Sequence, residues 1–309
     1  MKLILFLLFV NTNPIKTLVA VASLAVISSA FADVTVSGVF ETAVSTSGGV
    51  RSIIGGTNGS EISFGVSEDL GNGLKAIASS TLCVSLTQGN KDNTCGAPTA
   101  GGVTGVTPNA VNTYNSFIGL SSAEAGTVKI GQQFSNTFLV SAIGDSAGRA
   151  AISNYKAGGA QAQVAGALSY TSPSISGVTV SYQQTLDNSV AGYTNYAINY
   201  SNGALTAGYA SGKTGATTEG VFGVNYNFGV ATIYAGSASS TGAQTATGYG
   251  VSVPFGALTL SVGTSSDANG NATQYGVSYN LSKRTSVYAA NGVSDTAAST
   301  TIMGVRHNF

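Results

Sequence analysis

The feature that most constrains the fold of this chain is a long succession of short runs in which apolar and polar residues alternate. In one run, Ile62, Phe64 and Val66 fall on the same face, because successive side chains of an extended strand point to opposite sides. The tight Gly71–Gly73 segment then leads into the next run, which is typical of a hairpin. The predicted strands are Val34–Val44, Glu61–Leu70, Leu74–Leu82, Tyr114–Leu120, Thr127–Phe134, Gln163–Tyr170, Val178–Gln183, Asn195–Tyr200, Leu205–Tyr209, Val221–Phe228, Ala231–Gly236, Tyr249–Phe255, Leu258–Val262, Tyr275–Leu281, Thr285–Ala289 and Thr300–Phe309. They predict an all-β fold of about 16 antiparallel strands.

The composition favours a barrel in a membrane over a soluble β-sandwich. Hydrophobic residues make up 43% of the chain but charged residues only 8%, whereas ordinary globular domains carry about 25% charged residues. No stretch after Ala32 reaches the roughly 20 apolar residues of a membrane-spanning helix. Membrane residence is therefore expected to come from strands. The net charge of zero argues against nucleic acid as a partner.

The last run, Thr300–Phe309, is predicted to close the barrel. It alternates like the others and ends on an aromatic residue. At the end of a sandwich such a strand would leave an exposed edge, whereas in a closed barrel it pairs on both sides. We therefore expect it to meet Val34–Val44.

The amino terminus reads as an export signal. Lys16 is followed by an apolar run from Leu18 to Ile27 and then by a small-residue site that ends at Ala32. We expect residues 1–32 to be a signal peptide, residues 33–309 to be the barrel domain, and the true translation start to lie near Ile15, beyond residues 1–14. The alternative is an uncleaved membrane anchor.

The predicted connections alternate between tight turns and longer loops, as in outer-membrane barrels with short periplasmic turns and longer external loops. This alternation predicts that both termini are periplasmic and that Arg51 and Lys213 lie in external loops. The longer connections are expected to begin near Ser47, Gln88, Asn136, Asn188, Ser211, Ser239, Ser265 and Ser294.

Several segments resemble those of Gram-negative general porins, especially the beta-proteobacterial type. They occur in the same order along essentially the whole chain after the signal: Ser67–Ala76, Asn115–Leu120, Gly126–Phe134, Leu281–Thr285 and Gly304–Phe309. The resemblance implies a homotrimer of sixteen-stranded barrels in the cell outer membrane, a water-filled lumen, and a third external loop folded inward. It also implies contact with outer-membrane lipid and lipopolysaccharide, and an assembly signal at Phe309 that the barrel assembly machinery reads.

The candidate third loop runs from about Ser135 to Ala162, and a constriction there would set the size limit and ion preference of a pore. Its charged residues are Asp145, Arg149 and Lys156. In the family an acidic loop commonly faces basic residues of the wall, but the nearest wall positions in this chain are Glu61, Asn115 and Gln163, all expected to point inward by strand alternation. We therefore predict a weakly selective pore with at most a mild preference for cations.

Two lysines and two cysteines complete the candidate sites. Lys75 and Lys129 also point inward by alternation but lie close to periplasmic turns, so they are either part of the pore wall or solvated charges at its rim. Cys83 and Cys95 are the only cysteines, and in an oxidising envelope compartment a disulfide between them is expected, with free thiols as the alternative.

No enzymatic reading finds support in the sequence. His307 is the only histidine, and no acid or nucleophile is expected to converge on it. We therefore expect no enzyme and no cofactor. The predicted function is a channel for passive diffusion of ions and small hydrophilic solutes, and the alternative is a structural or adhesive surface protein without an open pore.

Overall fold

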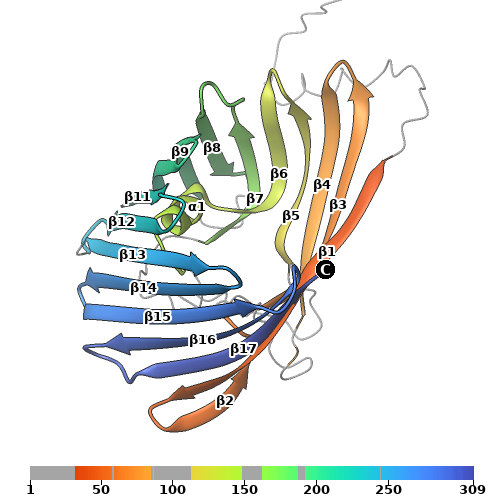
Figure 1. Ribbon diagram of the computed structural model, residues 1–309. Helices are drawn as coiled ribbons and strands as arrows, with labels where there is room; N and C mark the ends of the chain where they lie inside the picture. The colour runs from red at the N-terminus through yellow and green to blue at the C-terminus, as the bar shows by residue number, and fades with distance from the viewer. Residues whose placement is uncertain are drawn as a thin grey trace, which may run out of the picture.

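The computed structural model describes residues 32–57, 59–84, 86, 113–147, 162–186, 192–243 and 245–309 (Figure 1). Almost all of them lie in one antiparallel sheet. Its strands are β1 (Asp33–Ser47), β2 (Val50–Ile54), β3 (Ser60–Gly71), β4 (Leu74–Val84), β5 (Thr113–Ser122), β6 (Gly126–Phe134), β7 (Gln163–Thr171), β8 (Val178–Thr185), β9 (Tyr193–Asn202), β10 (Leu205–Thr214), β11 (Thr217–Asn227), β12 (Thr232–Ser240), β13 (Ala246–Phe255), β14 (Leu258–Asp267), β15 (Gly270–Asn280), β16 (Thr285–Ser294) and β17 (Thr300–Asn308). One helix, α1 (Asn136–Ile143), lies between β6 and β7.

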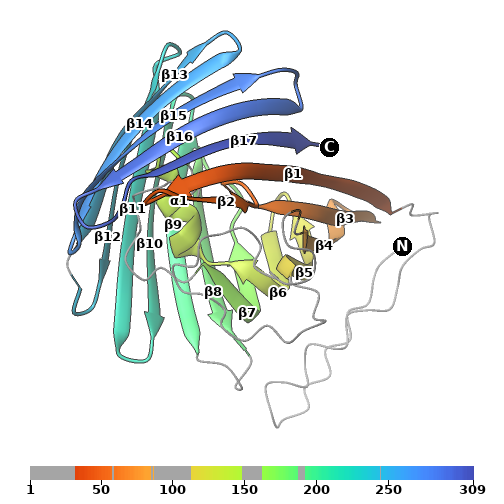
Figure 2. The same cartoon turned by 90° about the horizontal axis from the view of Figure 1, so that it is seen from below.

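The sheet closes on itself (Figures 1 and 2). From β3 onward each strand pairs with the next, and β17 pairs with β1 from Val39 opposite Asn308 to Ser47 opposite Thr300. The sheet has seventeen strand segments. Because β2 and β3 pair with different parts of β1, they occupy the same position beside that strand, and the barrel therefore has sixteen strand positions. The predicted all-β antiparallel barrel of about 16 strands is confirmed, and every predicted run overlaps a strand.

The strand β2 was not predicted. The chain turns tightly at Gly48 and Gly49, whose positive φ values of 55° and 82° suit glycine, and β2 then pairs with the C-terminal part of β1, from Ala43 to Ser47. The prediction that Arg51 lies in a loop is therefore wrong, because Arg51 pairs with Thr46 in this hairpin.

Burial alternates along the strands as the sequence predicted. The outward face carries large apolar side chains, such as Ile118, Ile130 and Ile198, which are at least half exposed. The inward face carries small or polar side chains. An apolar exterior and a polar interior are the arrangement expected of a barrel surrounded by lipid. Among the described residues, no helix is both long enough and apolar enough to cross a membrane.

The predicted alternation of tight and long connections holds only in part. The chain was expected to leave the sheet near Ser211 and near Ser265, but β10 continues to Thr214 and β14 to Asp267, and each then enters a two-residue turn. The prediction that Lys213 lies in a loop is therefore wrong as well. These strand ends are rich in Ser, Gly and Thr, so they resemble loops in composition while they pair as strands.

Helix α1 was also not predicted. It begins at the N-cap Ser135, whose hydroxyl accepts a hydrogen bond from the Phe138 amide at 3.0 Å, and it ends at Gly144. The helix lies inside the barrel and packs against β9 to β12 (Figure 2).

Candidate functional site

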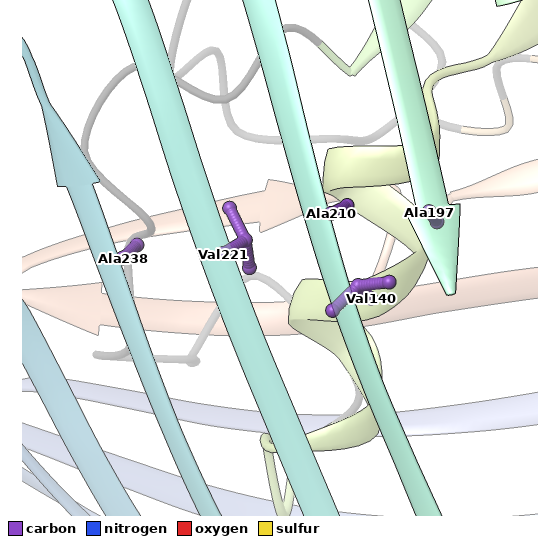
Figure 3. Close-up of a cluster of buried hydrophobic side chains, with 5 residues drawn as sticks. All are labelled: Val140, Ala197, Ala210, Val221 and Ala238. Atoms are coloured by element: carbon purple, nitrogen blue, oxygen red, sulfur yellow. The ribbon is translucent and has the colours of Figure 1, made fainter. Parts of the chain in front are cut away.

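The candidate site is the segment around α1, because it narrows the interior of the barrel on one side. Val140 is 1% exposed and packs against Ala197, Ala210, Val221 and Ala238, which project from β9, β10, β11 and β12 (Figure 3). Small side chains on the wall leave room for the helix. Full burial of a valine side chain contributes about 1.5–3 kcal/mol.

Glycines of the inner wall let the backbone of this segment approach closely. A Cβ atom at Gly223 would lie 2.4 Å from the Val140 carbonyl oxygen, and one at Gly250 would lie 2.4 Å from Ser146 Oγ. Both distances are far below van der Waals contact, so the wall is shaped to receive α1 and the residues that follow it.

A buried carboxylate holds the first turn of α1. Thr137 Oγ1 donates to Glu219 Oε1 at 2.8 Å, and the Tyr193 hydroxyl donates to the same oxygen. Thr137, Tyr193 and Glu219 are 0%, 2% and 6% exposed. Because hydrogen bonds to charged groups are stronger than neutral ones, this cluster is a strong anchor for the helix.

Amide side chains extend the anchoring to both ends of α1. Asn195 Oδ1 accepts from the Asn136 backbone amide at 3.1 Å, and Asn195 Nδ2 donates to Gln183 Oε1 at 2.8 Å. At the other end, Asn225 Nδ2 donates to the Ile143 carbonyl at 2.9 Å, which satisfies an acceptor that the helix leaves unpaired. The helix is therefore fixed to the wall along its whole length.

Of the three charged residues predicted for the constriction, only Asp145 lies in the described part of the chain. Asp145 is only 5% exposed, and its Oδ1 accepts from the Ala147 amide at 2.9 Å, so its carboxylate is not presented to solvent. Arg149 and Lys156 lie outside the described residues. Between Ser135 and Gly144 the segment carries no ionisable side chain at all.

Of the three wall positions, Glu61 and Asn115 lie on the inward face of β3 and β5 and are partly exposed. At Gln163 the alternation used for the prediction fails, because the β6–β7 register shifts between Gly131 and Gln133. There Gln163 accepts a hydrogen bond from Gln132 Nε2 at 3.0 Å. Simple strand parity does not define an inward orientation for Gln163.

The two lysines differ in environment. Lys75 is exposed on β4 next to the β3–β4 turn, which suits a solvated rim charge. Lys129 on β6 is partly buried, and its Nζ lies 4.4 Å from the centre of the Phe117 ring on the inward face of β5. Lys129 is therefore part of the wall, with a cation–π contact.

One charged cluster of the interior was not predicted from the sequence. Glu41 on β1 is fully buried, and its Oε2 accepts from Arg306 Nε on β17 at 2.9 Å. Its Oε1 accepts from the Tyr288 hydroxyl at 2.6 Å and from the Thr57 amide at 2.6 Å. Glu41 lies directly opposite Arg306 in the register, so pairing the first predicted strand with the last would have found this ion pair.

The two ends of the barrel domain meet at this seam. Phe309 and Gly38 exchange two backbone hydrogen bonds of 3.0 Å, and the Phe309 ring lies 5.1 Å from the Phe40 ring. Cys83 on β4 is disulfide-bonded, while its expected partner Cys95 lies outside the described residues. In the described part of the chain, no three potential ligands gather as a metal site would need.

The fold of the chain matches that of known proteins. A solved structure of an anion-selective porin from Comamonas acidovorans is 22% identical, with a TM-score of 0.70 over 90% of this chain and 100% of that one. A loop-deletion mutant of OmpT, an outer membrane protein of Vibrio cholerae, is 14% identical, with a TM-score of 0.66 over 90% and 99%. A mutant of Rh. blastica porin is 14% identical, with a TM-score of 0.65 over 90% and 100%.

No curated protein sequence matches the chain significantly. The sequence profile of a family described as Gram-negative porin matches residues 17–299, in agreement with the resemblance found in the sequence. The chain belongs to the Gram-negative porin family.

Proposed function

We propose that this protein is a channel of the outer membrane through which ions and small hydrophilic solutes diffuse passively. The observation that carries this proposal is the closed barrel of sixteen strand positions with a helix fixed to its inner wall. A barrel of this size encloses an aqueous channel, and a segment folded against the inside restricts its width. No chemistry and no energy source is needed for such transport, so the protein is proposed not to be an enzyme.

The channel is proposed to be weakly selective, with at most a mild preference for cations. Glu41 and Arg306 neutralise each other, and helix α1 carries no charge. Glu61 and Lys129 are of opposite sign and lie on the inward faces of different strands. Little unbalanced charge therefore stands on the described inner wall to sort ions by sign.

The family and the topology support a proposal for the orientation and assembly of the barrel. The strands β4, β6 and β8 all end at the end of the barrel opposite to Asp33 and Phe309, and more residues separate each of them from the next strand than separate β3 from β4 or β5 from β6. Longer loops are external in this class of barrel, which favours periplasmic termini. We further propose a homotrimer that contacts outer-membrane lipid and lipopolysaccharide, with Phe309 read by the barrel assembly machinery.

Recordings from planar bilayers containing the refolded protein test this function. Stable unitary currents, with a reversal potential near zero in a potassium chloride gradient, are expected. A strong anion preference would refute weak selectivity. The absence of an open state at any voltage would instead favour the alternative function, a structural or adhesive surface protein.

A further inference from the structure

Helix α1 has two faces of different chemistry. Thr137, Val140 and Ser141 contact the barrel wall and are at most 1% exposed. Since an α-helix turns by 3.6 residues, the opposite face carries Phe138, Leu139 and Ala142. This second face is apolar, and the Leu139 side chain is 51% exposed.

Helix α1 itself, Asn136–Ile143, carries no charged side chain next to this apolar face. Two carboxylates of the candidate site adjoin α1: Glu219 on β11 accepts a hydrogen bond from Thr137, on the wall side of the helix, and Asp145 follows the helix in the chain. Both are buried, at 6% and 5% exposed. A charged solute that reaches this surface therefore finds no exposed partner of opposite sign on α1.

An aromatic pair enlarges the surface at one end. The Phe138 ring stacks on the Phe134 ring at the end of β6, with centroids 5.3 Å apart and planes 14° from parallel. Both side chains are partly exposed. Together with Leu139 and Ala142 they form what we call the α1 apolar strip.

We propose that the α1 apolar strip determines the solute preference of the channel by binding, transiently, neutral solutes that carry an aromatic or alicyclic face. Such a solute removes its own apolar surface and that of the strip from water, while its polar groups stay hydrated. Fully hydroxylated solutes of the same size gain nothing there. This inference rests on the proposed channel function.

The test uses the full-length refolded protein in planar bilayers, with phenyl β-D-glucoside as probe and methyl β-D-glucoside as its matched control. We expect the phenyl compound to produce resolvable transient blocks of the open current and the methyl compound to produce none. In Leu139→Asn, which keeps the side-chain size, the blocks are expected to be shorter by about fivefold. The variant Leu139→Met, which keeps the apolar character of the side chain, should show blocks as long as those of the wild type.

Each outcome decides a separate point. Equal block durations for the two glucosides in an open wild-type channel would overturn the inference while leaving the channel function intact. Unchanged blocks in Leu139→Asn would overturn the assignment to the strip. A protein without any open current would overturn the proposed function, and the inference with it.

Discussion

Glu41 and Arg306 face each other across the seam at which the first and last strands of the barrel meet, and they form an ion pair although 265 positions separate them in the chain; the Arg306 side chain is 29% exposed. The carboxylate is fully buried and also accepts from Tyr288 and Thr57. Removal of Arg306 would leave the buried carboxylate without its cation, so we expect the pair to favour closure of the barrel in this register.

The first prediction concerns this seam. Glu41→Ala is expected to destabilise the barrel by about 1.5–3 kcal/mol, because it removes the carboxylate that accepts hydrogen bonds from Tyr288, Thr57 and Arg306. Urea unfolding in lipid vesicles, followed by tyrosine fluorescence, measures the change. Arg51→Gln, at an exposed position of β2, is the matched control and should leave the midpoint unchanged. If the unfolding midpoint of Glu41→Ala equals that of the wild type, Glu41 does not stabilise the seam.

The second prediction concerns the anchor of α1. Glu219→Ala removes the acceptor shared by Thr137 and Tyr193, and each such bond is worth about 1.5–3 kcal/mol. The helix should then leave the wall intermittently, which single-channel recordings would register as increased noise of the open current. Glu219→Gln keeps an acceptor oxygen, so its open current should be less noisy than that of Glu219→Ala. Glu124→Gln, in the exposed β5–β6 turn, serves as control, and equal noise in all variants would refute the anchoring role.

The third prediction concerns the fit between helix and wall. A methyl group at Gly223 would lie 2.4 Å from the Val140 carbonyl oxygen, so Gly223→Ala should displace α1 and cost about 1–3 kcal/mol. The unitary conductance should change with it. Gly192→Ala is the control, because a Cβ there meets no atom within 4 Å. If both variants conduct like the wild type, the helix does not restrict the channel.

The fourth prediction concerns Phe309. Its deletion removes two backbone hydrogen bonds to Gly38 and the ring contact with Phe40. We expect a lower yield of folded barrel in the outer membrane, measured by quantitative extraction, with an unchanged unitary conductance of the molecules that do fold, since the ring lies on the outward side. A normal yield would argue against an assembly role of this residue.

Much of the fold could be read from the sequence, because each strand carries its own period-two pattern. The pattern fails where composition imitates a loop, as at Ser211 and Ser265, or where a register shift breaks the parity, as at Gln163. For the candidate site, the sequence indicated that the segment after Ser135 is important. It also suggested that the charge of Asp145 faces the pore, whereas in the structure this residue is buried.

The sequence by itself determined the class of fold, the apolar exterior and the closing role of Thr300–Phe309, since alternation and turn residues are local properties of the chain. Only the tertiary structure decided that α1 forms and docks on the inner wall, and that Glu41 pairs with Arg306. Thr137 reaches Glu219 across 82 positions, and no local pattern encodes such a contact. It arises only when closure of the sheet brings distant strands around the helix.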